Sequence, residues 1–310
     1  MARIDTTVSL AGLCLKTPVM TASGTCGYGP ELLPFVDLRR LGAVVVKGIS
    51  VRPRPGNPPP RIVETCGGML NAIGLENIGM EAFAMETLPR LRGYETAVIV
   101  NLLGESQEEY GRIVERLDRE EGIDGFEVNV SCPNVRKGGI SFGSDPDILE
   151  GLVCFLRDKT QKPLIIKLSP NVTDIVDMAK RAEGGGADGL TLINTIRGMS
   201  VDAESRRPRL ATVVGGLSGP AIKPIALRMV WEVSRGVKIP VIGVGGILTA
   251  EDAVEFLITG ASAVQVGTAH FRNPAACIEI VQGIEAYLER HGMNSVRELV
   301  GSLRAEPAAF

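Results

Sequence analysis

Short apolar segments recur along the chain, and stretches with apolar residues at helical spacing lie between them. β-Branched content and segment length predict eight strands, at 19–22, 43–47, 97–102, 125–130, 164–168, 189–193, 241–244 and 263–266. Helical periodicity predicts eight helices, near 31–41, 79–92, 106–121, 146–159, 173–184, 219–235, 250–259 and 274–290. A strand followed by a helix, repeated eight times, is typical of a (β/α)8 TIM barrel. We therefore expect an α/β protein with residues 1–310 in a single barrel domain.

Three of the predicted helices begin with recognisable capping signals. Ser106 and Glu109 have the spacing of a capping box, and Asp145 precedes a proline suited to the first helical position. Thr249 precedes two acidic residues of another first turn. These signals support the predicted alternation of strands and helices.

Several segments depart from the simple repeat. Two short apolar runs at 8–10 and 13–15 flank Ala11-Gly12 and predict a small β-hairpin lid on one end of the barrel. Long loops are expected after the second, fourth and sixth strands, and the proline-rich part of the first of them, at 52–61, should be extended and exposed. Long loops in a compact domain are often functional, and these follow strand ends on the face where barrel enzymes act.

Composition and charge narrow the partners that the chain can have. Hydrophobic residues make up 45% of the chain and aromatic residues only 4%, as suits buried parallel strands. The net charge of −3 argues against nucleic-acid binding, and no apolar run is long enough for a membrane span or a signal sequence. The six cysteines are scattered without paired spacing, so we expect free thiols, no metal site and a cytoplasmic protein.

Polar residues and glycines close the predicted strands. In a barrel these positions converge on one mouth; they are Ser23, Lys47, Asn101, Asn129, Lys167, Asn194, Gly245 and Gly267. Strand ends that merely face solvent would also be polar. A buried lysine needs an anion, which a reduced flavin or a carboxylate substrate would supply; the alternative is a structural salt bridge to Glu127.

A thiol follows the fourth predicted strand, in the segment Glu127-Val-Asn-Val-Ser-Cys-Pro-Asn134. Asparagine amides beside Cys132 can hydrogen-bond a planar, uncharged ring, and the glycine-rich run at 134–143 could move over the thiol as a lid. The alternative is that Cys132 is a small buried hydrophobic residue in a turn.

Three glycine-rich turns, at 215–219, 243–247 and 267–268, lie where backbone N–H groups can bind phosphate oxygens. Neither a P-loop nor a Rossmann fingerprint is present, so a mononucleotide phosphate fits better than a dinucleotide. Glycines required only for tight turns would give the same pattern.

These motifs together resemble class 1 dihydroorotate dehydrogenase over nearly the whole chain. The resemblance rests on the segments Thr21-Ala-Ser-Gly24, Lys47-Gly-Ile-Ser50, Asn71-Ala-Ile-Gly-Leu-Glu-Asn77, Asn129-Val-Ser-Cys-Pro-Asn134, Lys167-Leu-Ser-Pro170, Asn194-Thr195, Gly245-Gly246 and Gly267-Thr268. The Ser-Cys-Pro-Asn segment is the most specific, because class 2 enzymes carry serine at the position of Cys132. The resemblance implies an FMN-binding barrel that oxidises dihydroorotate to orotate in pyrimidine synthesis.

The resemblance also implies a role for particular residues. It implies that FMN is bound by Ser23, Lys47, Gly48, Asn101, Asn129, Lys167, Ile193, Gly219, Gly245, Gly246, Gly267 and Thr268. It implies that dihydroorotate is bound by Lys47, Asn71, Ala72, Ile73, Gly74, Leu75, Asn129, Asn194 and Thr195. Cys132, as thiolate, would be the catalytic base that removes the C5 proton while the C6 hydride passes to the flavin.

Segments 71–77 and 23–29 resemble the type 1B catalytic subunit more than the type 1A enzyme. Type 1B implies a homodimer core with an electron-transfer subunit, in a heterotetramer, in which FAD and a [2Fe–2S] cluster pass electrons to NAD⁺. The alternatives are a fumarate-dependent type 1A homodimer, a flavin barrel of the dihydropyrimidine dehydrogenase type, and a non-redox barrel lyase or isomerase that binds a phosphorylated substrate.

Overall fold

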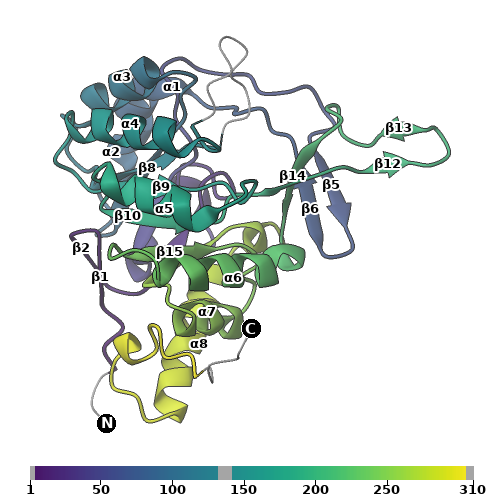
Figure 1. The fold of residues 1–310 in the computed structure, drawn as a ribbon. Coiled ribbons are helices and arrows are strands. Elements are labelled where there is room, and N and C mark those ends of the chain that lie inside the picture. The colour runs from purple at the N-terminus through teal and green to yellow at the C-terminus, as the bar shows by residue number, and fades with distance from the viewer. Residues whose placement is uncertain (1–3, 132–141, 305–310) are drawn as a thin grey trace.

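The computed structural model describes residues 4–131 and 142–304, and its centre is a closed barrel of eight parallel strands (Figure 1). The strands are β3 (Val19–Thr21), β4 (Ala43–Val45), β7 (Ala97–Leu102), β8 (Gly125–Asn129), β9 (Leu164–Lys167), β10 (Gly189–Leu192), β15 (Val241–Val244) and β16 (Ala263–Val266). The barrel closes where β16 pairs with β3, through Val264 and Val19. All eight predicted strands and the (β/α)8 fold are confirmed.

Helices cover the outside of the barrel. They are α1 (Gly79–Ala82), a π-helical turn (Phe83–Thr87), α2 (Leu88–Leu91), α3 (Gln107–Leu117), α4 (Pro146–Arg157), α5 (Ile175–Gly184), α6 (Lys223–Ser234), α7 (Ala250–Ile258) and α8 (Ala276–Arg290). Asp145 caps α4 as predicted, and Thr249 forms a full capping box with Asp252. The Ser106 side chain accepts from the Glu109 amide, but Glu109 accepts from the amide of Glu105, so the predicted box is only half formed.

The predicted helix at 31–41 is wrong. Two short 3₁₀ turns, Pro30–Leu32 and Leu38–Arg40, stand in its place. Pro34 lies between them, and a proline inside a helix removes a hydrogen-bond donor and clashes with the preceding turn. The Asp37 side chain then accepts from the Arg39 amide and begins the second turn.

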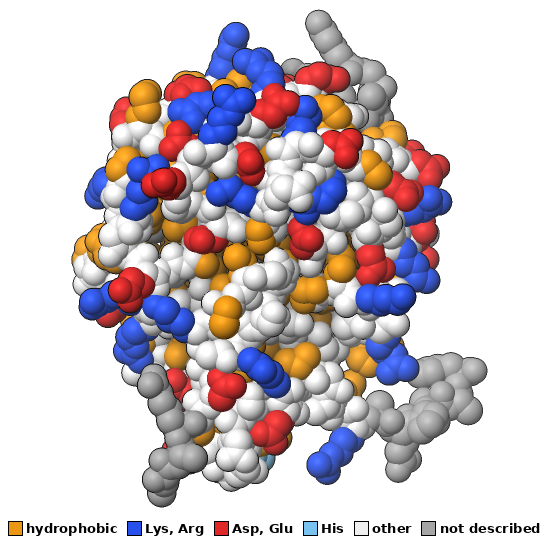
Figure 2. All heavy atoms as spheres, turned by 90° about the vertical axis from the view of Figure 1, so that its left-hand side faces the viewer, with side chains coloured by type: hydrophobic (Ala, Val, Ile, Leu, Met, Phe, Trp, Pro, Cys, Tyr) orange, Lys and Arg blue, Asp and Glu red, His pale blue; other side chains and the backbone are white. Residues whose placement is uncertain are grey.

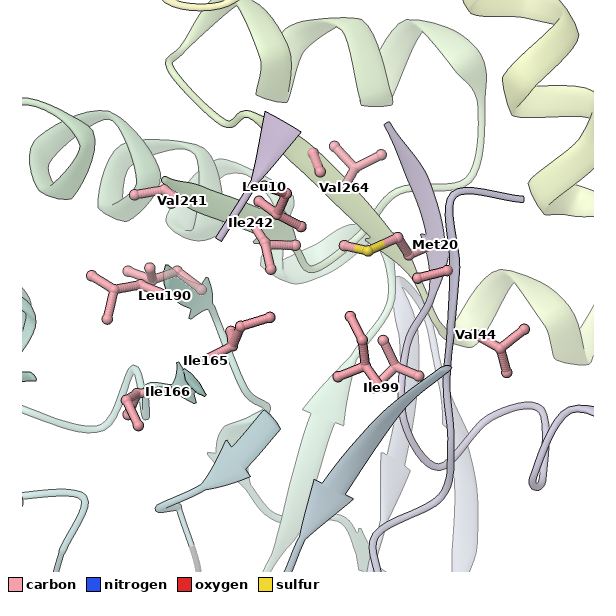
Figure 3. Close-up of a cluster of buried hydrophobic side chains, with 14 of the residues drawn as sticks. Leu10, Met20, Val44, Ile99, Ile165, Ile166, Leu190, Val241, Ile242 and Val264 are labelled. Carbon is pink, nitrogen blue, oxygen red and sulfur yellow. The ribbon is translucent and has the colours of Figure 1, made fainter. Parts of the chain in front are cut away.

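The interior of the barrel is apolar towards the amino ends of its strands (Figure 3). Met20, Ile99, Ile165 and Ile242 point into the enclosed space and have no solvent exposure. Leu10, from the hairpin formed by β1 (Val8–Leu10) and β2 (Leu13–Leu15), adds its fully buried side chain to this cluster. The predicted hairpin lid is therefore confirmed, and it closes the amino end of the barrel.

The hairpin lies on one side of the barrel, and a second, antiparallel sheet lies on the other (Figure 1). On the side of the hairpin, hydrophobic side chains gather near the middle of the surface, with charged side chains of both signs around them (Figure 2). The second sheet contains β5 (Ile62–Thr65), β6 (Gly68–Asn71), β11 (Ile196–Gly198) and β14 (Gly215–Ser218), in the order β11-β14-β6-β5. Beyond it, β12 (Val201–Asp202) and β13 (Arg207–Pro208) form a projecting arm.

This second sheet corrects the predicted loops after the second and sixth barrel strands. Both connections contain paired strands, because β6 and β14 satisfy one another's backbone groups across the mouth side of the barrel. The proline-rich segment 52–61 is mostly exposed, as predicted, and contains only an isolated bridge at Arg54. The predicted loop after the fourth strand falls mainly outside the described residues. None of the described helices is long and apolar enough to cross a membrane.

Candidate active site

The carboxyl half of the barrel interior contains a buried polar network centred on Glu127. This side chain has no solvent exposure, and it comes from the middle of β8. One carboxylate oxygen accepts from Asn101 Nδ2 at 2.8 Å, and the other accepts from Thr191 Oγ1 at 2.9 Å and from Gln265 Nε2 at 2.5 Å. Buried charges are tolerated where they are hydrogen-bonded in this way.

Lys167 at the end of β9 completes the network. Its ammonium lies 3.4 Å from Glu127 Oε1, 3.3 Å from Ser23 Oγ and 3.5 Å from Gln265 Oε1. The salt bridge considered as an alternative for the predicted lysines therefore exists for Lys167. Lys47, by contrast, makes no ion pair with any residue in the described part of the chain, and its side chain is half-buried.

The asparagines predicted to bind substrate meet beside this network. Asn194 Nδ2 donates to Asn129 Oδ1 at 3.0 Å, and the Thr195 amide donates to Asn194 Oδ1 at 2.7 Å. The Ser131 amide also donates to Asn129 Oδ1, at 3.2 Å. Tyr110 on α3 fixes the backbone here, since its hydroxyl donates to the carbonyl of Asn129 at 2.6 Å.

Asn71 reaches this group through the second sheet. Its amide nitrogen donates to the carbonyl of Gly216 at 3.2 Å, and a Cβ at Gly216 would lie 2.2 Å from Thr195 Oγ1. The second sheet thus places Asn71 and Thr195 next to the same residue, Gly216. Residues 72–75 continue from Asn71 as a half-buried turn in which Asn57 donates to the carbonyls of Ala72 and Ile73.

Three glycines predicted to bind phosphate also come together. Gly219, Gly245 and Gly246 all have positive φ, and a Cβ at Gly246 would lie only 3.0 Å from the carbonyl oxygen of Gly219. A Cβ at Gly245 would lie 3.5 Å from Ile193. Gly219 and Gly245 are buried and Gly246 is half-buried, so side chains here would clash with their neighbours, and the glycines form a closely packed backbone cradle next to the start of α6.

Hydroxyls border the same cradle. Thr268 Oγ1 donates to Ser218 Oγ at 2.8 Å, which joins the end of β16 to the end of β14. Gly267 lies against Ala22 at the end of β3, where a Cβ would come within 3.3 Å of the alanine methyl group. Gly48 lies against Asn101, whose Oδ1 would be 2.8 Å from a Cβ there. The residues that the resemblance assigned to FMN therefore lie around one mouth and fit a phosphate together with a polar ring.

The sequence analysis missed part of the buried network. It treated Glu127 only as a salt-bridge partner, and it did not single out Thr191 or Gln265. A signal was present, because each of these residues is a polar residue inside a largely apolar, buried barrel strand. A polar residue on the inward face of an otherwise apolar strand indicates a buried network.

Behind the mouth, a second buried cluster surrounds His270. Its Nε2 lies 3.2 Å from Cys277 Sγ, and its Nδ1 lies 3.5 Å from Thr25 Oγ1. Burial lowers the pKa of His270 to about 4, so the ring is neutral at physiological pH. Burial raises the pKa of the neighbouring Cys26 thiol to about 11. These groups pack the loops after β3 and β16 together in uncharged form.

The predicted catalytic residue, Cys132, lies outside the described residues, as do Asn134 and most of the predicted lid. Ser131, the residue before it, is described and lies half-buried beside Asn129. The assignment of Cys132 as base therefore stays a prediction.

Comparison with known proteins agrees with the family resemblance found in the sequence. Residues 5–288 match the family model described as dihydroorotate dehydrogenase. The chain is 57% identical over 303 residues to the "Dihydroorotate dehydrogenase B (NAD(+)), catalytic subunit" of Geotalea uraniireducens, covering 98% of this chain and 99% of the relative. It is 59% identical over 299 residues to the protein of the same name from Pelobacter propionicus, covering 96% of this chain and 98% of the relative.

A solved structure resembles the fold. The Eimeria tenella enzyme abbreviated DHODH, crystallised with ferulenol, aligns with a TM-score of 0.81 and 25% sequence identity. The alignment covers 96% of this chain and 88% of that one.

Proposed function

The chain belongs to the dihydroorotate dehydrogenase family, and we propose that it oxidises dihydroorotate to orotate in pyrimidine synthesis as the catalytic subunit of an NAD⁺-linked enzyme. The observation that carries this proposal is the joined pair Asn129 and Asn194 at the barrel mouth. Their amides are uncharged and have N–H donors beyond those used in these contacts, which suits the carbonyl groups of a pyrimidine ring. High identity over almost the full length of named relatives supports the same reaction.

We propose that FMN is the cofactor and that the mouth of the barrel holds it. The glycine cradle at Gly219, Gly245 and Gly246 would take the phosphate, together with Thr268 and the backbone of Gly267. The other predicted ligands would contact the ring, and they are Ser23, Lys47, Gly48, Asn101, Asn129, Lys167 and Ile193. Bound FMN supplies the hydride acceptor that no amino-acid side chain can provide.

We propose that the substrate lies against Asn71, Asn129, Asn194 and Thr195, with residues 72–75 closing one side. Dihydroorotate carries a carboxylate, and Lys47 is a half-buried cation without an ion-pair partner among the described residues. An ammonium held in this way favours an anionic group of the ligand. Lys47 would therefore orient the substrate as well as contact the cofactor.

We propose that Cys132 is the catalytic base that takes the C5 proton of dihydroorotate. It follows Ser131 directly, and Ser131 is fixed to Asn129 through its backbone amide. A thiolate is a stronger base than a carboxylate and is more readily formed near neutral pH than an alkoxide. The cysteine therefore suits proton removal at cytoplasmic pH.

The proposed reaction reduces the cofactor, which must be reoxidised before the next turnover. The chain has neither a Rossmann fingerprint nor paired cysteines for a cluster. We propose a second subunit with FAD and a [2Fe–2S] cluster that passes electrons to NAD⁺, docked on a homodimer of this chain. The names of the relatives, which contain "catalytic subunit" and "NAD(+)", support this arrangement. The five described cysteines are all free thiols, which fits a cytoplasmic location.

Anaerobic rapid mixing with dihydroorotate tests the assignment of the base. Wild-type protein should lose its oxidised flavin absorbance rapidly, whereas Cys132→Ser should retain FMN and orotate binding but reduce its flavin at least a hundredfold more slowly at neutral pH. The deficit should shrink as pH rises. Cys154→Ser, at an exposed thiol on α4, is the matched control and should behave as wild type. A Cys132→Ser protein that reduces flavin at the wild-type rate would overturn the assignment.

Turnover of the isolated chain distinguishes the two electron acceptors. We expect NAD⁺ reduction only after the candidate second subunit is added. Rapid fumarate reduction by this chain alone would instead indicate the self-sufficient homodimer.

A further inference from the structure

Glu127 is a buried carboxylate for which the proposed reaction has no use. It lies directly beneath two proposed cofactor ligands, Asn101 and Lys167, and contacts both. It is fully buried, so solvent does not screen its charge. A buried ion pair is often no more stable than an apolar replacement, and its presence at a site therefore suggests a role other than stability.

The two charges of this pair are held differently. Neutral donors fix the carboxylate at 2.5–2.9 Å, through Asn101, Thr191 and Gln265. Among the described residues, the Lys167 ammonium makes contacts of 3.3–3.5 Å, longer than the 2.7–2.9 Å typical of a charge-assisted hydrogen bond. The carboxylate is therefore held by short hydrogen bonds, whereas the ammonium is held by long ones.

We propose that Glu127 is a positioning residue that sets the reduction potential of the bound flavin by neutralising Lys167. The inference rests on the proposed FMN site. A reduced flavin ring can carry a negative charge that the oxidised ring lacks, so an unpaired cation beside it favours the reduced form. With Glu127 in place, the floor of the site is neutral, and the lysine favours reduction less than it would alone. The carboxylate thus keeps the reduced cofactor able to give up its electrons.

The test compares the binding of oxidised and reduced FMN to the holoenzyme and to Glu127→Gln. The amide has the same shape but no charge, so Lys167 would lose its counter-charge. We expect reduced FMN to bind at least tenfold more tightly, relative to oxidised FMN, than in wild type. A tenfold change is a positive shift of about 30 mV for a two-electron couple. Equilibration with redox dyes measures the potential directly.

Asp188→Asn is the matched control. Asp188 also pairs with a cation, Arg157 at 2.6 Å, but it lies at the amino end of β10 and accepts from the amide of Leu164 there. Its substitution removes the same charge at the far end of the barrel, so the ratio of the two FMN affinities should change less than twofold. A purely structural role of Glu127 would weaken both forms of FMN equally and leave the potential unchanged.

A second variant keeps the test decisive if Glu127→Gln does not fold. Glu127→Gln combined with Lys167→Met removes both charges, and we expect an affinity ratio within about threefold of wild type. A double variant that favours oxidised FMN tenfold would show that Lys167 acts without Glu127 and would overturn the inference. An unchanged potential in a folded Glu127→Gln protein with wild-type cofactor content would also overturn it. Wild-type chain that binds no FMN would overturn the proposed function as well.

Discussion

The amino and carboxyl halves of the barrel interior are formed by the same strands, but the first is apolar and the second is polar. Ile99 and Ile165 point into an apolar cluster at the amino end, and the residues two positions further along, Asn101 and Lys167, belong to the buried polar network. Two residues of a strand span about 6.6 Å, so the transition occurs within a single layer of side chains. Burial is nearly complete in both halves.

The difference separates stability from function. Burying the apolar layer is favourable in proportion to its area, whereas burying Glu127 and Lys167 requires desolvation that their contacts only partly offset. The hairpin adds Leu10 to the apolar layer and closes that end, while the other end holds the polar network of Glu127 and Lys167. Burial of apolar side chains in the amino half therefore offsets the cost of burying polar side chains in the carboxyl half.

The largest effect on stability should come from breaking the buried pair at the polar end. Lys167→Met leaves the Glu127 carboxylate buried without its counter-charge, and we expect a loss of about 3–5 kcal/mol in the free energy of unfolding. Urea denaturation followed by circular dichroism measures it. Adding Glu127→Gln to the same protein should recover most of the loss. Equal stability of Lys167→Met and wild type would show that the pair is not energetically coupled.

At the apolar end, Leu10→Ala should cost about 2–4 kcal/mol, because it removes a fully buried side chain from the barrel plug. FMN affinity should stay at the wild-type value, since the hairpin lies at the opposite end of the strands from the proposed site. Leu13→Ala, on the same hairpin but only half-buried, is the control and should cost less. A large drop in FMN affinity for Leu10→Ala would contradict the separation of the two halves.

The buried, neutral His270 makes the stability of the folded protein depend on pH. Its pKa is about 4 in the folded protein and about 6.5 when unfolded, so the unfolded state binds more protons between these values. Stability should therefore fall as pH falls, with about 2–3 kcal/mol lost through this group between pH 7 and pH 4.5. His270→Asn should flatten that part of the profile, whereas the same change at the exposed His291 should not. Identical profiles for the two variants would argue against the burial effect.

The smallest effect should come from one hydroxyl beside the glycine cradle. Thr268→Val removes the hydrogen bond to Ser218 beside the proposed phosphate site, and we expect FMN affinity to fall about fivefold, or about 1 kcal/mol. Fluorescence titration with apoprotein measures the affinity. Thr259→Val, at the end of α7, removes a hydroxyl that bonds only to its own helix and should leave the affinity unchanged.

Local pattern was sufficient to predict the barrel. Continuous apolar runs such as Val-Val-Val-Lys47 and Leu-Ile-Ile-Lys167 predict strands that are buried on both faces, because neither face of the strand carries polar residues that could meet water. Their polar ends converge because all eight strands run in parallel. The eight polar or glycine residues that follow the strands were predictable for the same reason, since position at a strand end is a local property, whereas the remaining candidate site residues came only from the family resemblance. The helix at 31–41 failed where helical periodicity was followed without regard to Pro34.

Contacts between distant segments could not be predicted from the sequence. Asn71 and Gly216 are 145 residues apart, and nothing in either segment specifies the other as its partner in the second sheet. Glu127 and Gln265, 138 residues apart, each read as an isolated polar residue within an apolar strand. Closure of the barrel decides which of these groups meet, because buried donors and acceptors must find partners once water is excluded. The strands and their polar ends follow from local sequence, whereas the meeting of Glu127 on β8 with Gln265 on β16 depends on the closed barrel.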